Sequence, residues 1–137
     1  MQSIRAAACL VCLAAMALPV AGQGPATSEP CGKARTAPEA LYKELTKDSK
    51  LREMARSDEF VAFEDGRDGT LWTFTLPPHP AHPAVVCRRI MERRGVLEIP
   101  TTVECKGAEQ ACAKLRSDFD MLNERVIGDL YAKQKAK

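Results

Sequence analysis

The spacing of apolar residues near the start of the folded region predicts a helix. Five apolar residues recur at roughly helical intervals: Leu41, Leu45, Leu51, Met54 and Ala55. This spacing predicts a helix over residues 36–56. Thr36 and Glu39 have the separation of a capping box, and Pro38 is tolerated in a first helical turn. The apolar stripe is narrow, so we expect the helix to lie on a surface rather than inside a core.

From residue 58 the apolar positions alternate, which is typical of β-strands. The run EFVAFEDGRDGTLWTFTL predicts two short strands joined by a loop with two Asp-Gly pairs. On the second strand Trp72 and Phe74 share one face, which we expect in the core. Residues 84–105, AVVCRRIMERRGVLEIPTTVEC, predict a second hairpin that turns near Arg94 and Gly95. Pro100 predicts an edge position or a bulge.

Helical spacing returns over residues 108–132. The repeating apolar positions are Cys112, Leu115, Phe119, Leu122 and Val126. A coiled-coil dimer is the less favoured use of this helix, because the repeat is short and lacks ordered flanking charges. The element order predicts an α+β fold: a small four-stranded antiparallel sheet of two hairpins, with an N-terminal and a long C-terminal helix packed on one face. One domain would span residues 36–132, followed by a basic tail over 133–137.

The N-terminus has the layout of a secretory signal peptide. One cation, Arg5, precedes an uncharged apolar run over residues 6–20, and Val20 and Gly22 are placed for cleavage before Gln23. The run is short for a bilayer span, so an uncleaved anchor is the less favoured alternative. We expect residues 1–22 to be removed from a periplasmic protein. The Pro- and Gly-rich residues 23–35 predict a flexible arm.

The cysteines predict a disulfide-stapled domain. The CLVC motif lies in the expected signal peptide and would carry no chemistry in the mature protein. Four cysteines remain: Cys31, Cys87, Cys105 and Cys112. An even number in an oxidising compartment predicts two disulfides, for which three connectivities are open. We favour Cys105 with Cys112, because a strand end and the next helix start are close, and Cys31 with Cys87, which would tie the arm to the sheet.

Composition gives no sign of nucleic-acid binding or of a common enzyme class. The chain has 20 Lys and Arg against 18 Asp and Glu, a net charge of +2, and loss of Arg5 leaves about +1. Seven aromatic residues (one Trp, two Tyr, four Phe) are few for a stacking platform. The sequence lacks a GxSxG elbow, a glycine-rich phosphate loop and an HExxH motif. We therefore expect neither catalysis nor a cofactor.

The segment LPPHPAHPAVVC, residues 76–87, is the most distinctive stretch of the chain. Its prolines exclude a regular helix. In a polyproline conformation His79 and His82 face the same way but stand about 9 Å apart, so a shared metal would need a turn and further ligands. These histidines are therefore weak metal candidates. With Pro80 and Pro83 they form a candidate recognition loop, although a rigid connection between hairpins is the favoured interpretation.

Arginines gather on the second predicted hairpin. The candidate anion contacts are Arg88, Arg89, Arg93 and Arg94. Guanidinium groups bind phosphate and carboxylate groups well. Strand alternation, however, sends Arg88 and Arg89 to opposite faces. We favour a solvated edge strand that its charges protect from pairing with other sheets.

Two segments resemble a known group of proteins. The run LWTFTLPPHPAHPAVVCRRI, followed by ECKGAEQACAKLRSDFDMLNER, resembles small exported proteobacterial proteins with no assigned activity. They share a W-T-F-T strand, an H-P-A-H-P segment and a C-x6-C pair before the final helix. The resemblance covers residues 70–125. It implies a Cys105–Cys112 pair and adds no mechanism.

These observations predict an exported periplasmic binding or accessory protein without catalytic activity. Its partner would be another envelope protein or an anionic cell-wall or lipid component. One alternative is an inhibitor or immunity-type protein that plugs an enzyme cleft. Another is metal handling through His79 and His82. We expect no nucleic-acid partner and no membrane span after cleavage, and the oligomeric state stays open.

Overall fold

The computed structural model describes residues 31–137. The expected signal peptide, its CLVC motif and the first part of the arm lie outside these residues. In chain order the elements are η1 (Gly32–Arg35), α1 (Pro38–Leu45), β1 (Leu51–Arg56), β2 (Phe60–Asp65), β3 (Leu71–Thr75), β4 (Ala84–Arg88), β5 (Met91–Arg93), β6 (Val96–Glu98), β7 (Thr101–Cys105) and α2 (Glu109–Lys135). The α+β class is confirmed.

The main sheet has five antiparallel strands in the order β1-β2-β3-β4-β7, and β5 and β6 form a second, two-stranded sheet. The expected count of four strands is therefore wrong. The predicted second hairpin exists, but irregular backbone at residues 89–90 and 99–100 divides it. Pro100 has no N–H to donate to a ladder. Arg94 and Gly95 form the turn with φ of 54° and 78°, as the sequence indicated.

The fifth strand, β1, replaces the second half of the predicted N-terminal helix. The helix ends at Leu45 and residues 51–56 pair with β2 instead. An Asp48 carboxylate oxygen accepts the N–H of Lys50 at 2.9 Å, which turns the chain. The predicted capping box is also absent, because the helix begins at Pro38 and the N-cap, Ala37, makes no side-chain hydrogen bond.

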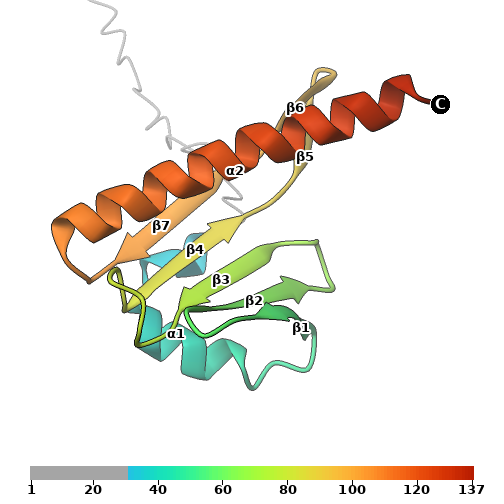
Figure 1. The fold of residues 1–137 in the computed structure, drawn as a ribbon. Coiled ribbons are helices and arrows are strands. Elements are labelled where there is room, and N and C mark those ends of the chain that lie inside the picture. The colour runs from blue at the N-terminus through green and yellow to red at the C-terminus, as the bar shows by residue number, and fades with distance from the viewer. Residues whose placement is uncertain (1–30) are drawn as a thin grey trace, which may run out of the picture.

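The two helices cover opposite faces of the sheet, so the expectation that both pack on one face is wrong (Figure 1). The α1 face buries Leu41, Leu45, Val61, Phe63, Trp72, Phe74, Val85 and Cys87. The α2 face buries Ala81, Ala84, Val86, Leu115 and Phe119. Side chains alternate between the two faces along β3. Trp72 and Phe74 therefore lie in the core on the α1 face, while Thr73 and Thr75 are buried on the opposite face.

One disulfide stands at each face of the sheet. Cys31 bonds Cys87 on the α1 side, and Cys105 of β7 bonds Cys112 of α2. These are the two pairs favoured from the sequence. The Cys31 bond holds η1 against the body, so residues 32–35 of the expected arm are a short 3-10 helix.

Helix α2 ends three residues later than predicted, at Lys135, and therefore includes most of the expected basic tail. Within residues 31–137, no helix is both long and apolar enough to cross a membrane.

Candidate functional site

A cavity of about 290 Å³ opens between α1 and the connection from β3 to β4. Its lining residues are Pro38, Glu39, Tyr42, Lys43, Phe74, Thr75, Leu76, Pro77, His82, Pro83 and Ala84. The walls are mostly apolar and the volume is near the lower limit for small-ligand pockets. The cavity therefore suits one apolar group of a partner molecule.

The connection from β3 to β4, which contains the HPAHP segment, forms one wall of this cavity through Leu76 and Pro77 at its start and His82 and Pro83 at its end. Between these residues the chain folds into two successive turns. The N–H of His79 donates to the carbonyl of Leu76, and the N–H of His82 donates to the carbonyl of His79, each at 2.9 Å. Ala81 between them is fully buried. A Cβ on Gly107 would stand only 2.5 Å from the Ala81 carbonyl, so glycine is required for this close approach. The segment is thus seated on the body rather than projecting from it.

Thr75 and His82 close the base of this wall. The Thr75 hydroxyl accepts the N–H of Ala84 at 2.8 Å and lies 3.3 Å from the Ala84 carbonyl. Nδ1 of His82 lies 2.9 Å from the Thr75 carbonyl oxygen. A carbonyl oxygen only accepts, so Nδ1 carries the proton in the neutral ring and Nε2 presents a lone pair. The cavity is therefore lined by an imidazole held in one orientation.

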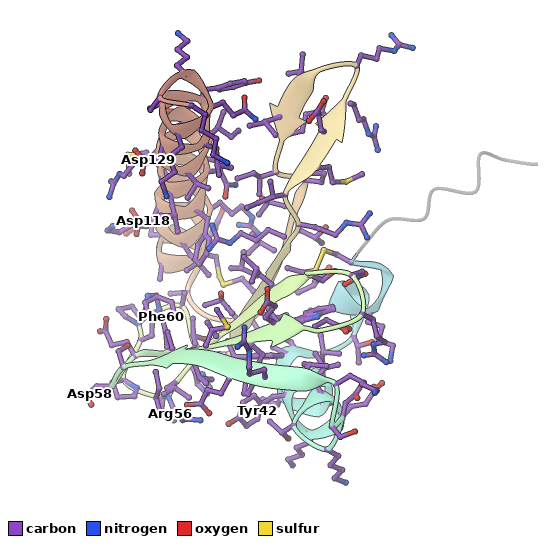
Figure 2. The ribbon with its side chains drawn as sticks, turned by 90° about the vertical axis from the view of Figure 1, so that its right-hand side faces the viewer. Tyr42, Arg56, Asp58, Phe60, Asp118 and Asp129 are labelled. Atoms are coloured by element: carbon purple, nitrogen blue, oxygen red, sulfur yellow. A yellow bond between two sulfur atoms is a disulfide. The ribbon has the colours of Figure 1, made fainter. Side chains whose placement is uncertain are left out.

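His79 belongs to the other side of the sheet. Its Nδ1 accepts the N–H of Ala81 at 3.0 Å, and its ring packs on Phe60 with centroids 4.6 Å apart. Phe60 lies on the α2 side of the strands and Tyr42 on the α1 side (Figure 2). The two histidines thus face different environments and do not converge. In the described part of the chain, no group of three or more His, Cys, Asp or Glu residues is placed to hold a metal ion.

Aromatic packing fixes the floor of the cavity, and charged residues form its rim. The ring of Tyr42 meets that of Phe74 edge-on at 5.1 Å, and Phe63 packs behind both. Glu39 and Lys43 stand one turn apart on α1 with exposed side chains. An apolar floor with a polar rim resembles the core and rim of a protein interface.

The four candidate arginines do not form one patch. Arg88 is half-buried under α2, where its guanidinium carbon is 5.2 Å from the Phe119 ring centroid and Nη1 donates to Asn123 at 3.1 Å. Burial lowers the pKa of Arg88 from its ordinary value. Arg89 pairs with Asp68 at 3.3 Å. Arg93 and Arg94 are exposed near the tip of the β5–β6 hairpin.

A second cavity, of about 360 Å³, has a mixed polar and apolar lining beside two turns of the chain. Arg67 at its edge binds Asp48 at 2.6 Å and Asp65 at 2.7 Å. The hydrogen bond from Arg67 holds the pKa of the Asp65 carboxyl below its usual range. These contacts link the turn after α1 to the turn after β2. The charge of Arg67 is paired with two carboxylates of the protein itself.

Comparison with known proteins provides no homologue: no family model, curated protein or solved structure matches the chain. Sequence reasoning singled out the HPAHP segment but missed α1 as the facing wall. The only available signal was Tyr42, an aromatic residue beside the narrow apolar stripe of a predicted surface helix.

Proposed function

We propose that the protein is an exported binding protein without catalytic activity, which takes an apolar side chain of a partner protein into the cavity between α1 and the HPAHP segment. The observation that carries this proposal is the apolar cavity itself. Burying one Leu or Phe side chain there would contribute on the order of 2 kcal/mol, enough for one anchor of a larger interface.

The rigidity of the walls supports a binding role. Prolines fix the backbone of the segment, and Thr75 accepts hydrogen bonds from the N–H of Ala84 and from Nδ1 of His82, which hold the ends of the segment together. A wall that is already ordered loses little entropy when a partner arrives. The two disulfides fit an oxidising compartment and support export, with another envelope protein as the partner.

Two other roles gain less support. A cleft-plugging loop should project, whereas this segment is folded back and Ala81 is fully buried. Catalysis by a cysteine would need a free thiol, and every cysteine among residues 31–137 is disulfide-bonded.

The test is an NMR titration of the protein with blocked amino acids, namely the N-acetyl amides of phenylalanine, leucine and alanine. We expect the phenylalanine and leucine probes to shift the resonances of Tyr42, Phe74 and His82, and the alanine probe to shift none. Lys43→Trp should abolish the shifts, because Lys43 lines the cavity and a Trp there would cover it.

Lys47→Trp is the matched control, since Lys47 is equally exposed but lies outside the cavity lining. Shifts that survive Lys43→Trp, or that Lys47→Trp removes as well, would contradict the proposal. So would the absence of any shift at probe concentrations of tens of millimolar, the range that a contribution of about 2 kcal/mol requires.

A further inference from the structure

The end of the molecule farthest from the cavity is built from two segments distant in sequence. Residues 89–99, with the β5–β6 hairpin, lie beside residues 129–137 of the C-terminal region, as both views show (Figures 1 and 2). We call these two segments the hairpin end. The hydroxyl of Tyr131 accepts the N–H of Leu97 at 3.0 Å and fastens them together.

Apolar surface is exposed at the hairpin end. Ile90 and Val96 are 44% and 54% exposed, and they are two of only four large apolar residues with such exposure among residues 31–137. Beside them an open cavity of about 400 Å³ is lined by Ile90, Leu97, Leu130, Lys133, Gln134 and Lys137. The floor of this cavity is aliphatic and its charged lining residues are both lysines.

The hairpin end also concentrates the positive charge of the folded region. Its cations are Arg89, Arg93, Arg94, Lys133, Lys135 and Lys137, and its acids are Glu92, Glu98 and Asp129. Six against three gives a net charge of +3, while the rest of residues 31–137 holds 13 cations against 14 acids, a net charge of −1. Arg94 and the three lysines make no ion pair with any described residue, whereas Arg93 has Glu98 at 3.8 Å and Arg89 has Asp68, outside the hairpin end, at 3.3 Å.

We infer that the hairpin end docks on an anionic lipid bilayer. The cations would meet the phosphate groups, and Ile90 and Val96 would enter the boundary between headgroups and acyl chains. Cations alone would suit any polyanion, but exposed aliphatic side chains among them match an amphiphilic surface. Docking there leaves the cavity beside α1 free at the opposite end, so this inference does not rest on the proposed function.

Vesicle co-sedimentation tests the inference, with protein recovered from its host and its N-terminus established by mass spectrometry. Vesicles of phosphatidylethanolamine with a quarter phosphatidylglycerol should bind the protein, and vesicles of phosphatidylcholine alone should not. Binding should weaken as salt rises. Lys133→Ala with Lys137→Ala should weaken binding about 25-fold, at about fivefold for each cation. Lys47→Ala with Lys106→Ala, two exposed lysines away from the hairpin end, should change it less than about twofold.

A second variant pair locates the contact without relying on affinity. Val96→Trp should give a blue shift of tryptophan emission when anionic vesicles are added, whereas Met54→Trp, at a comparably exposed site on β1, should give none. Equal losses from both lysine pairs, equal shifts from both tryptophans, or equal binding to neutral vesicles would each overturn the inference. Equally tight binding of dispersed short-chain phosphatidylglycerol would also overturn it, because it would indicate single amphiphiles rather than a bilayer.

Discussion

The two ends of the β4–β7 ladder are held in different ways. At the end where the HPAHP segment meets β7, which we call the loop end, the Cys105–Cys112 bond, the Gly107–Ala81 contact and the hydrogen bonds of Thr75 act within a few residues of one another. At the hairpin end the Leu97–Tyr131 hydrogen bond joins partly exposed segments. Strands β4 and β7 therefore connect the tightly held wall at the loop end to the weakly packed surface at the hairpin end.

This difference separates the two proposed contacts. A cavity that recognises one side chain needs walls that do not move. A surface that meets lipid needs exposed apolar and basic groups, and those groups contribute little to packing. The cysteine and Gly107 substitutions act on covalent and packing constraints, Gly128→Ala acts on helix propensity, and Tyr131→Phe acts on the weaker fastening of the hairpin end.

Removal of the disulfides should have the largest effect. Cys31→Ala with Cys87→Ala opens a bond across 56 residues and should lower the free energy of unfolding by about 4 kcal/mol from loop entropy. Cys105→Ala with Cys112→Ala opens a bond across 7 residues and should lower it by about 2.5 kcal/mol. Urea unfolding of both variants gives the two values. If Cys105→Ala with Cys112→Ala lost as much unfolding free energy as the other pair, or more, the loop-end bond would contribute more than chain entropy.

Two glycine substitutions should change stability with opposite signs. Gly107→Ala places a Cβ against the Ala81 backbone and should destabilise the protein by roughly 1–3 kcal/mol. Gly128→Ala, in an exposed part of α2 just before the hairpin end, meets nothing within 4 Å and should stabilise by about 0.5–1 kcal/mol through helix propensity. Thermal and urea unfolding of each variant measure the two changes in stability. Loss of stability at both sites would contradict the distinction between a packed and an open end.

Tyr131→Phe should have a small effect, and a local one. It removes the acceptor for the N–H of Leu97, with a cost of about 1 kcal/mol. Amide hydrogen exchange should accelerate at Leu97 while Val86, fully buried between β3 and β7, keeps its protection. Uniform acceleration at both amides would indicate that the hairpin end unfolds together with the main sheet.

Residue patterns predicted most elements, and the errors have physical causes. The spacing of Leu51, Met54 and Ala55 fits a helix better than an alternating strand, but pairing with β2 decided the outcome. Both helices were expected on one face of the sheet because the sequence predicted a core only on the Trp72 and Phe74 face, whereas Thr73 and Thr75 on the opposite face are buried as well. Tertiary contacts override local preference in such short segments.

The site could be predicted only in part. The HPAHP segment was recognisable from its composition, but the cavity depends on where α1 lies in space. Likewise, Arg93 and Arg94 were visible as a cluster, whereas the contact of the β5–β6 hairpin with the end of α2 follows from the path of α2 across the sheet. Spacing along a chain predicts periodicity within one element and carries no information about which elements meet.

The two disulfides also determine how the protein would respond to tension. A force applied between residues 31 and 137 would pass from Cys31 to Cys87, along residues 88–104, and from Cys105 to Cys112 before it reaches the rest of α2. Helix α1, strands β1 to β3 and the HPAHP segment lie outside this load path. The hairpin end would extend first, while the cavity stayed assembled inside its covalent ring.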